Sequence, residues 1–528
     1  MTAQPDVEAI KAGYTFTTPS IDLGVLMVDG QPDPSTRIRL SLSMLNRHGL
    51  IAGATGTGKT RTLQLIAEQI SRAGVAVFAA DIKGDLSGIA VPGEASEKLL
   101  ARTQKIGQDW KPEGCPAEFY SLGGQGTGVP LRATVSSFGP ILLSKVLGLN
   151  ETQESSLGLV FHFADSQGLP LLDLADLKEV MLYLTSDEGK PVLRELGGLS
   201  SATVGVILRS LVTLQTQGAD AFFGETEFDT RDLLRVTSDG KGVISLLELP
   251  NLQDRPAIFS TFLMWLLADL FHDLPEVGDV DVPKLVFFFD EAHLLFNGAS
   301  KAFLDAIAQT VRLIRSKGVG IFFVTQAPTD VPDTVLAQLG SRVQHQLRAH
   351  TPNDAKALKA TVQTYPTSSY DLAETLQSLG IGEAIVTVLN PDGAPTPVAW
   401  TRMLAPLGSM SPMNPDWLAK GVAASSMRAK YGPAINRESA YEMLVARLEQ
   451  GAAKAQADAQ AAQAQKEQAQ AQKEQARQER AERQPATRSS RAQPRSSVER
   501  VLGSATFWNQ VMRVGGEVVR TVWGTARK

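Results

Sequence analysis

A glycine-rich octapeptide near the start of the chain determines the fold of the residues around it. Gly53–Thr60 matches the phosphate-binding loop pattern Gly-x4-Gly-Lys-Thr at every required position. The apolar segment Gly49–Ala52 precedes this loop, and apolar residues at helical spacing follow it from Leu63 to Ile70. A strand, a glycine-rich loop and the start of a helix in this order form an anion-binding site. The alternative is an ordinary glycine-rich turn, which would need neither the Lys-Thr pair nor the flanking strand and helix. The sequence therefore predicts a bound nucleoside triphosphate.

The residue types of this loop have separate tasks. Glycines let the backbone wrap round the phosphates so that successive N–H groups point inward. Lys59 is expected to reach the β- and γ-phosphates, and the Thr60 hydroxyl to hold Mg²⁺. The predicted cofactors are accordingly ATP and Mg²⁺. The predicted nucleotide-binding residues are Gly53, Ala54, Thr55, Gly56, Thr57, Gly58, Lys59, Thr60 and Arg61.

Composition narrows the class of protein. A chain of 528 residues with 43% hydrophobic residues can form more than one domain. The single cysteine, Cys115, excludes a disulfide within the chain and a zinc site built from cysteines. No apolar run reaches about 18 residues and no basic segment leads an apolar one, so we expect a cytoplasmic protein. The net charge of −5 indicates that any nucleic-acid contact is local, such as the inner surface of a ring.

Strands and helices alternate on both sides of a helical stretch, which predicts an α/β, RecA-like fold with a mainly parallel, doubly wound sheet. Expected strands after the loop are 75–80, 242–249, 284–289 and 320–324, and expected helices are 257–271 and 301–317. Short β segments are expected at 14–18, 23–28 and 37–42. The predicted domains are a small β-rich element at 1–45, a P-loop core at 46–94 and 241–410, a mainly helical insertion at 95–240, a helical extension at 411–450, an Ala/Gln/charged linker at 451–497 and an amphipathic helix at 498–528.

Polar motifs fall where the predicted core strands end, at the edge of the sheet that binds ligands. Phe-Phe-Phe is followed by Asp290 and Glu291, a Walker B motif in which Asp290 holds the magnesium ion and Glu291 polarises the attacking water. Plain solvation of a strand end is the alternative for this acidic pair. His293 either reports the γ-phosphate state to a neighbouring loop or satisfies a turn.

Two further strand ends carry polar residues. Gln326, after Thr325, can hydrogen-bond the lytic water or the γ-phosphate, and the alternative is a capping glutamine. Asp81 begins the segment Asp81–Asp85 and can support the magnesium shell or position Lys59, while Lys83 and Asp85 can line a pore.

Phosphoryl transfer also needs positive charge at the leaving oxygens, which a neighbouring subunit often supplies. Arg312 and Arg315 lie three residues apart on one helix face, and Arg47 precedes the first core strand. Each can equally be a surface ion-pair partner.

The C-terminal part changes composition sharply. From 451 to 497 the chain is rich in Ala, Gln, Glu, Lys and Arg without an apolar seam, which is typical of a solvated helix or a disordered linker. The segment 498–528 regains spaced apolar residues and arginines. It is either an amphipathic helix that docks a partner or a membrane surface, or a helix that folds back on its own protein.

The ordered set of motifs resembles the HerA/FtsK-type ATPases, and most of all their bacterial "helicase HerA-like C-terminal" branch. The resemblance rests on the P-loop and on the segments 46–49, 81–88, 289–293, 325–328, 339–354 and 431–444. It implies a hexameric ring in which ATP is hydrolysed between subunits and duplex DNA passes through a central pore. It also implies arginine fingers at Arg315 and, as a second candidate, Arg47. HerA-type proteins carry a full β-barrel before the ATPase, whereas about 45 residues here allow only a reduced one, a departure that counts against docking of the usual nuclease. The resemblance still implies a nuclease or another protein as partner.

Two functions follow from these residues and this resemblance. The first is a ring-forming DNA translocase or helicase powered by ATP hydrolysis, with catalytic residues Glu291, Lys59, Gln326, Arg315 and Arg47. The second is a nucleotide-gated ATPase that acts on a protein partner or at a membrane surface without moving DNA. The acidic balance and the Ala/Gln linker favour the second reading, and the family resemblance favours the first.

Overall fold

The computed structural model describes residues 6–195, 197–249, 256–297 and 299–482. The chain divides into two compact units, the first ending at Leu448 and the second starting at Glu449. The first unit carries a sheet whose strand order is β2-β1-β12-β11-β10-β3-β9-β8-β4-β7-β5-β6. The strands are β1 Ser20–Val28, β2 Gln31–Ser41, β3 Gly49–Ala52, β4 Ala76–Asp81, β5 Ala117–Leu122, β6 Val129–Leu131, β7 Ile244–Glu248, β8 Leu285–Phe289, β9 Val319–Thr325, β10 Ser341–Gln344, β11 Glu383–Thr387 and β12 Ala399–Met403.

The sheet has a parallel half and an antiparallel half. From β10 through β3 to β6 every neighbouring pair is parallel, and from β10 to β2 every pair is antiparallel. The parallel strands β4, β8 and β9 are buried along their whole length, as strands covered by helices on both faces must be. The predicted α/β fold with a mainly parallel, doubly wound sheet is confirmed.

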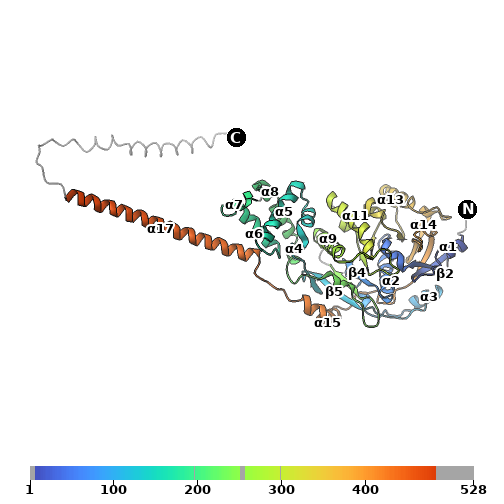
Figure 1. Ribbon diagram of the computed structural model, residues 1–528. Helices are drawn as coiled ribbons and strands as arrows, with labels where there is room; N and C mark the ends of the chain where they lie inside the picture. Colours follow the sequence, from blue (N-terminus) through green and yellow to red (C-terminus); the bar gives the residue numbers. More distant parts are fainter. Residues whose placement is uncertain (1–5, 196, 250–255, 298, 483–528) are drawn as a thin grey trace. The chain divides into compact units, whose positions relative to one another are not determined.

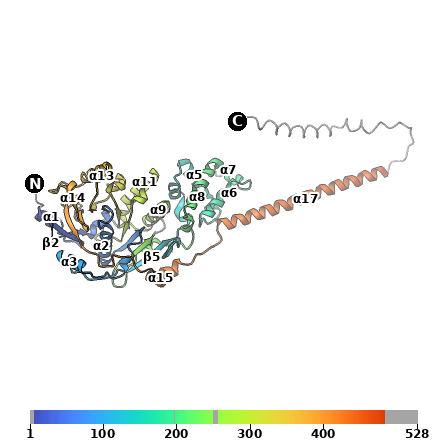
Figure 2. The ribbon, with the colours of Figure 1, turned by 180° about the vertical axis from the view of Figure 1, so that it is seen from behind.

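Helices cover both faces. The helices are α1 Val7–Gly13, α2 Lys59–Arg72, α3 Glu97–Lys105, α4 Val135–Val146, α5 Glu151–Ser166, α6 Leu174–Thr185, α7 Lys190–Glu195, α8 Ser201–Thr216, α9 Pro256–Asp273, α10 His293–Phe296, α11 Lys301–Ile314, α12 Asp333–Leu336, α13 Pro352–Val362, α14 Leu372–Ser378, α15 Pro415–Ala424, α16 Ser426–Tyr431 and α17 Ala440–Glu482. The chain winds from β3 through α2 to β4 in one direction along the sheet and from β8 through α11 to β9 in the other. Right-handed crossovers therefore place α2 and α11 on opposite faces, and Figures 1 and 2 show α11 and α13 across the sheet from α3 and α15.

The N-terminal β segments belong to this same sheet. β1 pairs with both β2 and β12, so the first strands extend the antiparallel half. The strand expected at 14–18 is wrong, because the chain there leaves α1 and turns into β1. Tyr14 is fully buried, and its hydroxyl bonds the carbonyl oxygens of Val386 and Pro397 at 3.0 and 2.9 Å. Its apolar body suits a core position as well as a strand, and the sequence pattern does not separate the two.

The insertion expected at 95–240 is partly strand. β5 and β6 continue the parallel half, and the helices α4–α8 begin only at Val135. Both strands are short and are broken by Pro and Gly nearby, so their periodicity is weak. Figure 1 shows α5, α6, α7 and α8 gathered in one cluster next to α4 and α9. Phe222 packs edge-on against Phe262 and Trp265 of α9, which joins this cluster to the core.

The helix α17 runs across the predicted boundary at 450/451 without a break. Every residue from Glu449 to Glu479 is exposed, which fits a composition with no apolar stripe. The predicted amphipathic helix at 498–528 and the end of the predicted linker lie outside the described residues. No helix in the described part of the chain combines the length and apolar character needed to cross a bilayer.

Candidate nucleotide-binding site

Four parallel strands bring the predicted motifs to one edge of the sheet. The P-loop follows β3, Gln326 follows β9, Asp290 and Glu291 follow β8, and Asp81 ends β4. Because the carboxyl ends of parallel strands share an edge, these side chains converge. β9 lies between β3 and β8, so the Walker B strand is the second neighbour of the P-loop strand.

The loop itself has the backbone of a phosphate cradle. Gly53, Gly56 and Gly58 have φ of 155°, 82° and 117°, in the range that favours glycine. A Cβ at Gly53 would lie 2.5 Å from the Cβ of His345, whereas one at Gly56 would meet nothing within 4 Å. Gly53 is therefore required by close packing and Gly56 by its backbone conformation.

Lys59 opens α2 and is only 6% exposed. Its ammonium donates to the carbonyl oxygen of Ala54 at 3.3 Å. Burial lowers the pKa of Lys59, and the carboxylates of Glu291 and Asp290 oppose that shift through their charge. A charge effect of this kind is expected for a lysine and two carboxylates at the carboxyl ends of neighbouring parallel strands.

The two Walker B acids differ in environment. Asp290 is 1% exposed; one carboxylate oxygen accepts from the backbone N–H of Glu291 at 2.9 Å, and the other has no hydrogen-bond partner among the described residues. Burial raises the pKa of Asp290 to about 7. Burial also acts to raise the pKa of Glu291, but the hydrogen bond and charge of Lys83 hold it below its usual value.

The backbone at Glu291 is left-handed, with φ of 46°, which costs a non-glycine residue about 1 kcal/mol. Its carboxylate forms an ion pair with Lys83 and lies 3.2 Å from Nδ1 of His293. A strained backbone that aims a carboxylate into a ligand site is typical of a functional position.

Asp81 holds the segment that carries Lys83. Its carboxylate accepts backbone N–H bonds from Lys83 at 3.2 Å, Gly84 at 2.7 Å and Leu86 at 2.7 Å. Burial raises the pKa of Asp81 to about 6. In the described structure Asp81 thus organises the loop after β4, and its predicted contact with a magnesium shell stays a prediction.

The residues at the end of β9 lie between the P-loop strand and the Walker B strand. Thr325 donates to Asp330 at 2.7 Å, and the backbone N–H of Ala327 donates to the same carboxylate at 2.9 Å. Gln326 is exposed and lines a cavity of about 350 Å³ together with Thr55 and Arg348. Its amide is therefore free of the turn that Asp330 fixes.

The arginines are brought together, but away from this edge. Arg47 lies shortly before β3, which begins at Gly49, and Arg315 shortly before β9, which begins at Val319, so both lie at the amino ends of the strands. Both contact the Asp279 carboxylate, at 3.1 and 3.5 Å. Neither can reach the P-loop of its own chain. Arg312 is exposed on α11 and lines a separate hollow.

Two residues near the site escaped the sequence analysis. His345 is fully buried beneath the P-loop, where Nε2 lies 2.9 Å from the Thr62 hydroxyl and Nδ1 lies 2.8 Å from the carbonyl oxygen of Glu383. Glu248 ends β7 beside Asp81, and burial raises its pKa to about 7. The role of Glu248 near the site could have been predicted from its position at a strand end, whereas no local sequence pattern indicates that His345 lies beneath the P-loop.

The donor set fits one magnesium ion. In the described residues no group of three or more His, Cys, Asp or Glu side chains is arranged to hold a metal alone. Mg²⁺ in phosphoryl-transfer sites needs only one or two protein oxygens, because phosphates and waters supply the rest. The unpartnered oxygen of Asp290, with the Thr60 hydroxyl at the start of α2, matches that need.

Comparison with known proteins gives three findings. The family model "Helicase HerA-like C-terminal" matches residues 27–528. A probable helicase of Methanocaldococcus jannaschii is 24% identical over 393 residues, which cover 70% of this chain and 68% of the relative. The DNA double-strand break repair helicase HerA of Saccharolobus solfataricus is 23% identical over 361 residues, which cover 67% of this chain and 64% of HerA.

Among solved structures, the bacterial conjugative coupling protein TrwB shares the fold. Its unbound form has a TM-score of 0.51 and 15% identity, and the match covers 77% of this chain and 94% of TrwB. TrwB has also been crystallised with the non-hydrolysable ATP analogue ADPNP and with ADP and Mg²⁺, each matching with a TM-score of 0.50, 16% identity and coverage of 77% and 93%.

Proposed function

Because the chain belongs to the helicase HerA-like C-terminal family, we propose that it is an ATP-hydrolysing motor that works as a homo-hexameric ring and moves DNA. ATP and Mg²⁺ are its cofactors. The proposal rests on the ends of the parallel strands at which these residues lie. Lys59, Asp290 and Glu291 lie at the carboxyl ends, whereas Arg47 and Arg315 lie at the amino ends.

The site divides the work of hydrolysis among its residues. The backbone N–H groups of the P-loop and the Lys59 ammonium bind and orient the phosphates. Asp290 and Thr60 hold the magnesium ion, which neutralises charge on the phosphate oxygens. Glu291 polarises the attacking water, for which its lowered pKa keeps it ionised at neutral pH. The exposed amide of Gln326 bonds the lytic water or the terminal phosphate.

The arginines require a second copy of the chain. An arginine that stabilises the transferring phosphate is often supplied by a neighbouring subunit. Arg315 and Arg47 lie at the opposite edge, where a neighbouring copy can present its P-loop edge to them. A head-to-tail contact of this kind generates a closed ring when the rotation closes.

DNA is the proposed substrate because relatives in sequence are named helicases, one of them for DNA double-strand breaks. The net charge of −5 restricts any contact with DNA to part of the surface, such as a ring's pore. Lys83 is 37% exposed next to the catalytic edge and is a candidate for such a contact. We further propose that the protein acts in the cytoplasm and that its partner is a nuclease or another protein.

A second function keeps the hydrolysis and changes the target. The acidic balance of the chain and the exposed run of α17 from Glu449 to Glu479 favour a nucleotide-gated ATPase that acts on a protein partner or at a membrane surface. The two functions share the site and differ in what stimulates it.

The deciding experiment measures the ATP hydrolysis rate with and without duplex DNA, while light scattering sizes the particle with a non-hydrolysable ATP analogue. Hydrolysis that depends on Lys59, rises with duplex DNA and comes from a hexamer supports the motor. Lys59-dependent hydrolysis that no nucleic acid stimulates supports the second function.

A further inference from the structure

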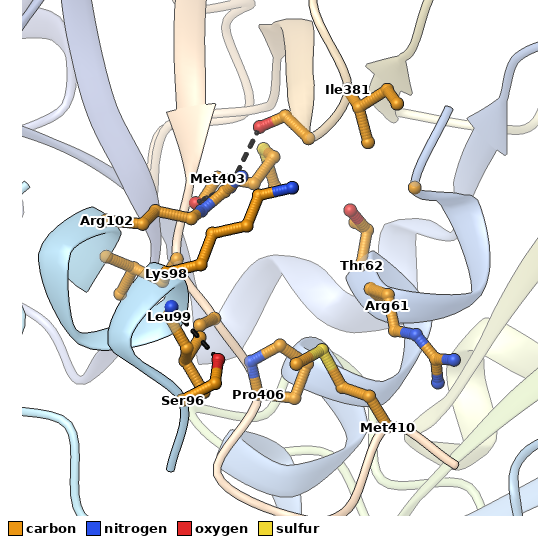
Figure 3. Close-up of a pocket in the computed structure, with 14 residues that line it drawn as sticks. Arg61, Thr62, Ser96, Lys98, Leu99, Arg102, Ile381, Met403, Pro406 and Met410 are labelled. Carbon is orange, nitrogen blue, oxygen red and sulfur yellow. Dashed lines mark hydrogen bonds between the residues drawn. The ribbon is translucent and has the colours of Figure 1, made fainter. Parts of the chain in front are cut away.

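A second cavity opens directly beside the start of α2. It measures about 270 Å³ and lies between the first turn of α2, helix α3 and the chain from Met403 to Met410 (Figure 3). Its lining residues are Gly58, Arg61, Thr62, Ser96, Lys98, Leu99, Arg102, Ile381, Gly382, Met403, Leu404, Ala405, Pro406 and Met410. Small-molecule sites begin at about 300 Å³, so the cavity suits a compact ligand or part of a larger one.

The cavity is continuous with the P-loop. Gly58 belongs to the loop, and Arg61 and Thr62 lie in the first turn of α2 on its cavity side. A nucleotide whose terminal phosphates lie in the loop must direct its ribose and base away from Lys59 along one flank of α2. The cavity that contains Gln326 is lined by Ala54 and Thr55, in the first half of the P-loop. The cavity beside Gly58, Arg61 and Thr62 lies at the other end of the loop, and we expect the ribose and base there.

The walls of this cavity are mainly apolar and cationic, with the hydroxyl residues Thr62 and Ser96 as further polar members. Leu99, Met403, Pro406 and Met410 supply apolar surface, and Ile381 is 72% exposed. The lining residues, all within the described part of the chain, include no carboxylate and no side-chain amide. Figure 3 shows the Lys98 side chain extending across the opening.

Four backbone carbonyl oxygens of the cavity wall already accept hydrogen bonds from side chains. Arg102 donates to the carbonyl oxygens of Gly382 at 3.3 Å and Met403 at 2.8 Å. Gln108 donates to the carbonyl oxygen of Ala405 at 2.7 Å, and Trp110 to that of Pro406 at 2.7 Å. The lining therefore offers the exocyclic amino group of adenine neither a carboxylate nor an amide side chain, the groups that usually read the edge of this base.

We propose that this cavity holds the base and ribose of the bound nucleotide and selects them by shape and apolar contact rather than by hydrogen bonds to the base edge. Lys98 covers the nucleoside, and Ile381 and Met410 pack against the base. The chain then accepts guanine nucleotides as well as adenine nucleotides. This inference rests on the proposed function, because it extends the same ATP site.

The expected selectivity between adenine and guanine nucleotides follows from the mainly apolar lining of the cavity. A site that hydrogen-bonds a ligand group rejects the analogue lacking that group by about 10⁴-fold or more, whereas an apolar pocket discriminates between similar ligands by about 10- to 200-fold. We therefore expect ADP and GDP to bind with affinities within about 30-fold of each other.

Isothermal titration of the full chain with ADP, GDP and inorganic pyrophosphate, each with Mg²⁺, tests the proposal. Pyrophosphate occupies the P-loop but has neither base nor ribose. Lys98→Ala and Ile381→Ser, both at exposed positions, are each expected to weaken ADP and GDP about tenfold and to leave pyrophosphate unchanged. Lys105→Ala removes another exposed lysine of α3 outside the cavity and is expected to change none of the three.

The outcomes separate this inference from the proposed function. The inference is overturned if Lys98→Ala and Ile381→Ser leave ADP binding unchanged, or if ADP binds more than 10³-fold tighter than GDP. Loss of pyrophosphate and ADP together would place both residues at the phosphates, which also overturns it. The proposed function fails on different evidence, namely binding or hydrolysis that persists in Lys59→Ala.

Discussion

Lys83, in the loop after β4, forms an ion pair with the Glu291 carboxylate at the end of β8. The pair ties the residue that polarises water to a loop whose lysine is 37% exposed. His293 contacts the other oxygen of the same carboxylate at 3.2 Å. The ion pair with Lys83 thus restrains the carboxylate, while the oxygen that faces His293 has no hydrogen-bond partner in the described part of the chain.

Lys83→Met should raise the basal rate of ATP hydrolysis. Without the pair, Glu291 can turn toward the attacking water. A partly exposed ion pair contributes up to about 1 kcal/mol, so we expect an increase of up to about fivefold. Steady-state hydrolysis without DNA measures it, with ADP affinity as the control because Lys83 lies outside the P-loop. A rate that falls instead would assign Lys83 to catalysis itself.

Glu291→Gln should separate binding from chemistry. The amide keeps the size of the side chain but cannot act as a general base, so hydrolysis should fall by about 10²- to 10⁴-fold. Binding of ADP with Mg²⁺ should stay within about twofold of the unchanged protein, since Asp290 carries the metal contact. Unchanged turnover in this variant would remove Glu291 from the chemistry.

Arg315→Ala should abolish hydrolysis without weakening nucleotide binding, by about 10³-fold if Arg315 acts as an arginine finger. Mixing Arg315→Ala with Lys59→Ala protein should restore part of the activity, because some interfaces then combine an intact Lys59 with an intact Arg315. Arg312→Ala, one turn earlier on α11, is the matched control and should keep full activity. Mixed rings that form and stay inactive would contradict a role between subunits.

His48→Asn should flatten the pH dependence of stability. His48 is buried, Nε2 donates to the Val311 carbonyl oxygen at 2.7 Å and Nδ1 accepts from the Ile321 N–H at 3.0 Å, so both nitrogens are satisfied in the neutral ring. Burial lowers its pKa to about 4 from 6.5. The folded state therefore binds fewer protons than the unfolded state, and the stabilisation is present above pH 6.5 and lost as pH falls toward 4.

The full shift corresponds to about 3 kcal/mol. Urea unfolding between pH 6.5 and 4.5 should show a smaller loss of unfolding free energy in His48→Asn than in the unchanged protein. Asparagine is chosen because it does not titrate in this range and its side chain keeps both a donor and an acceptor. Buried carboxyls such as Asp290 act in the opposite direction, so only the difference between the two proteins is diagnostic. Equal slopes would exclude His48 as the source.

Gly53→Ala and Gly56→Ala form a matched pair in the P-loop. Both alanines would occupy an unfavourable backbone region, at about 1 kcal/mol each. Only the alanine at 53 also meets a neighbour, the Cβ of His345 at 2.5 Å. We expect Gly56→Ala to weaken ADP binding about fivefold and Gly53→Ala at least tenfold more, measured by titration calorimetry. Equal losses of ADP affinity in the two variants would indicate that the His345 side chain shifts at little cost to make room for an alanine at position 53.

The parts of the fold that follow local rules were predictable from the sequence. β3 and the start of α2 lie where the glycine pattern places them, and the long apolar runs at β4, β8 and β9 gave strands to within a few residues. β5 and β6 were missed because three to six residues between prolines and glycines carry little periodicity. Tyr14 was misplaced because a buried aromatic residue suits a strand and a core turn equally.

The long-range contacts of the site were not predictable. His345 reaches the P-loop only because β10 pairs with β3, and Asp279 joins Arg47 to Arg315 across more than 200 residues of chain. Such contacts depend on strand order, which spacing along the chain does not specify. The grouping of polar residues at strand ends was predictable, because it needs only that the strands be parallel.

The P-loop stands where the two halves of the sheet meet. Its backbone is bonded to the parallel half through Thr325, at 3.2 Å, and to the antiparallel side through Gln346, at 2.8 Å, and Gly382, at 2.9 Å. A shift of the loop on phosphate release must therefore either strain its hydrogen bonds to both halves of the sheet or move both halves with it. The two halves join at β10, which pairs in parallel with β3 and antiparallel with β11, so the loop after β3 is one strand away from the change of direction in the sheet.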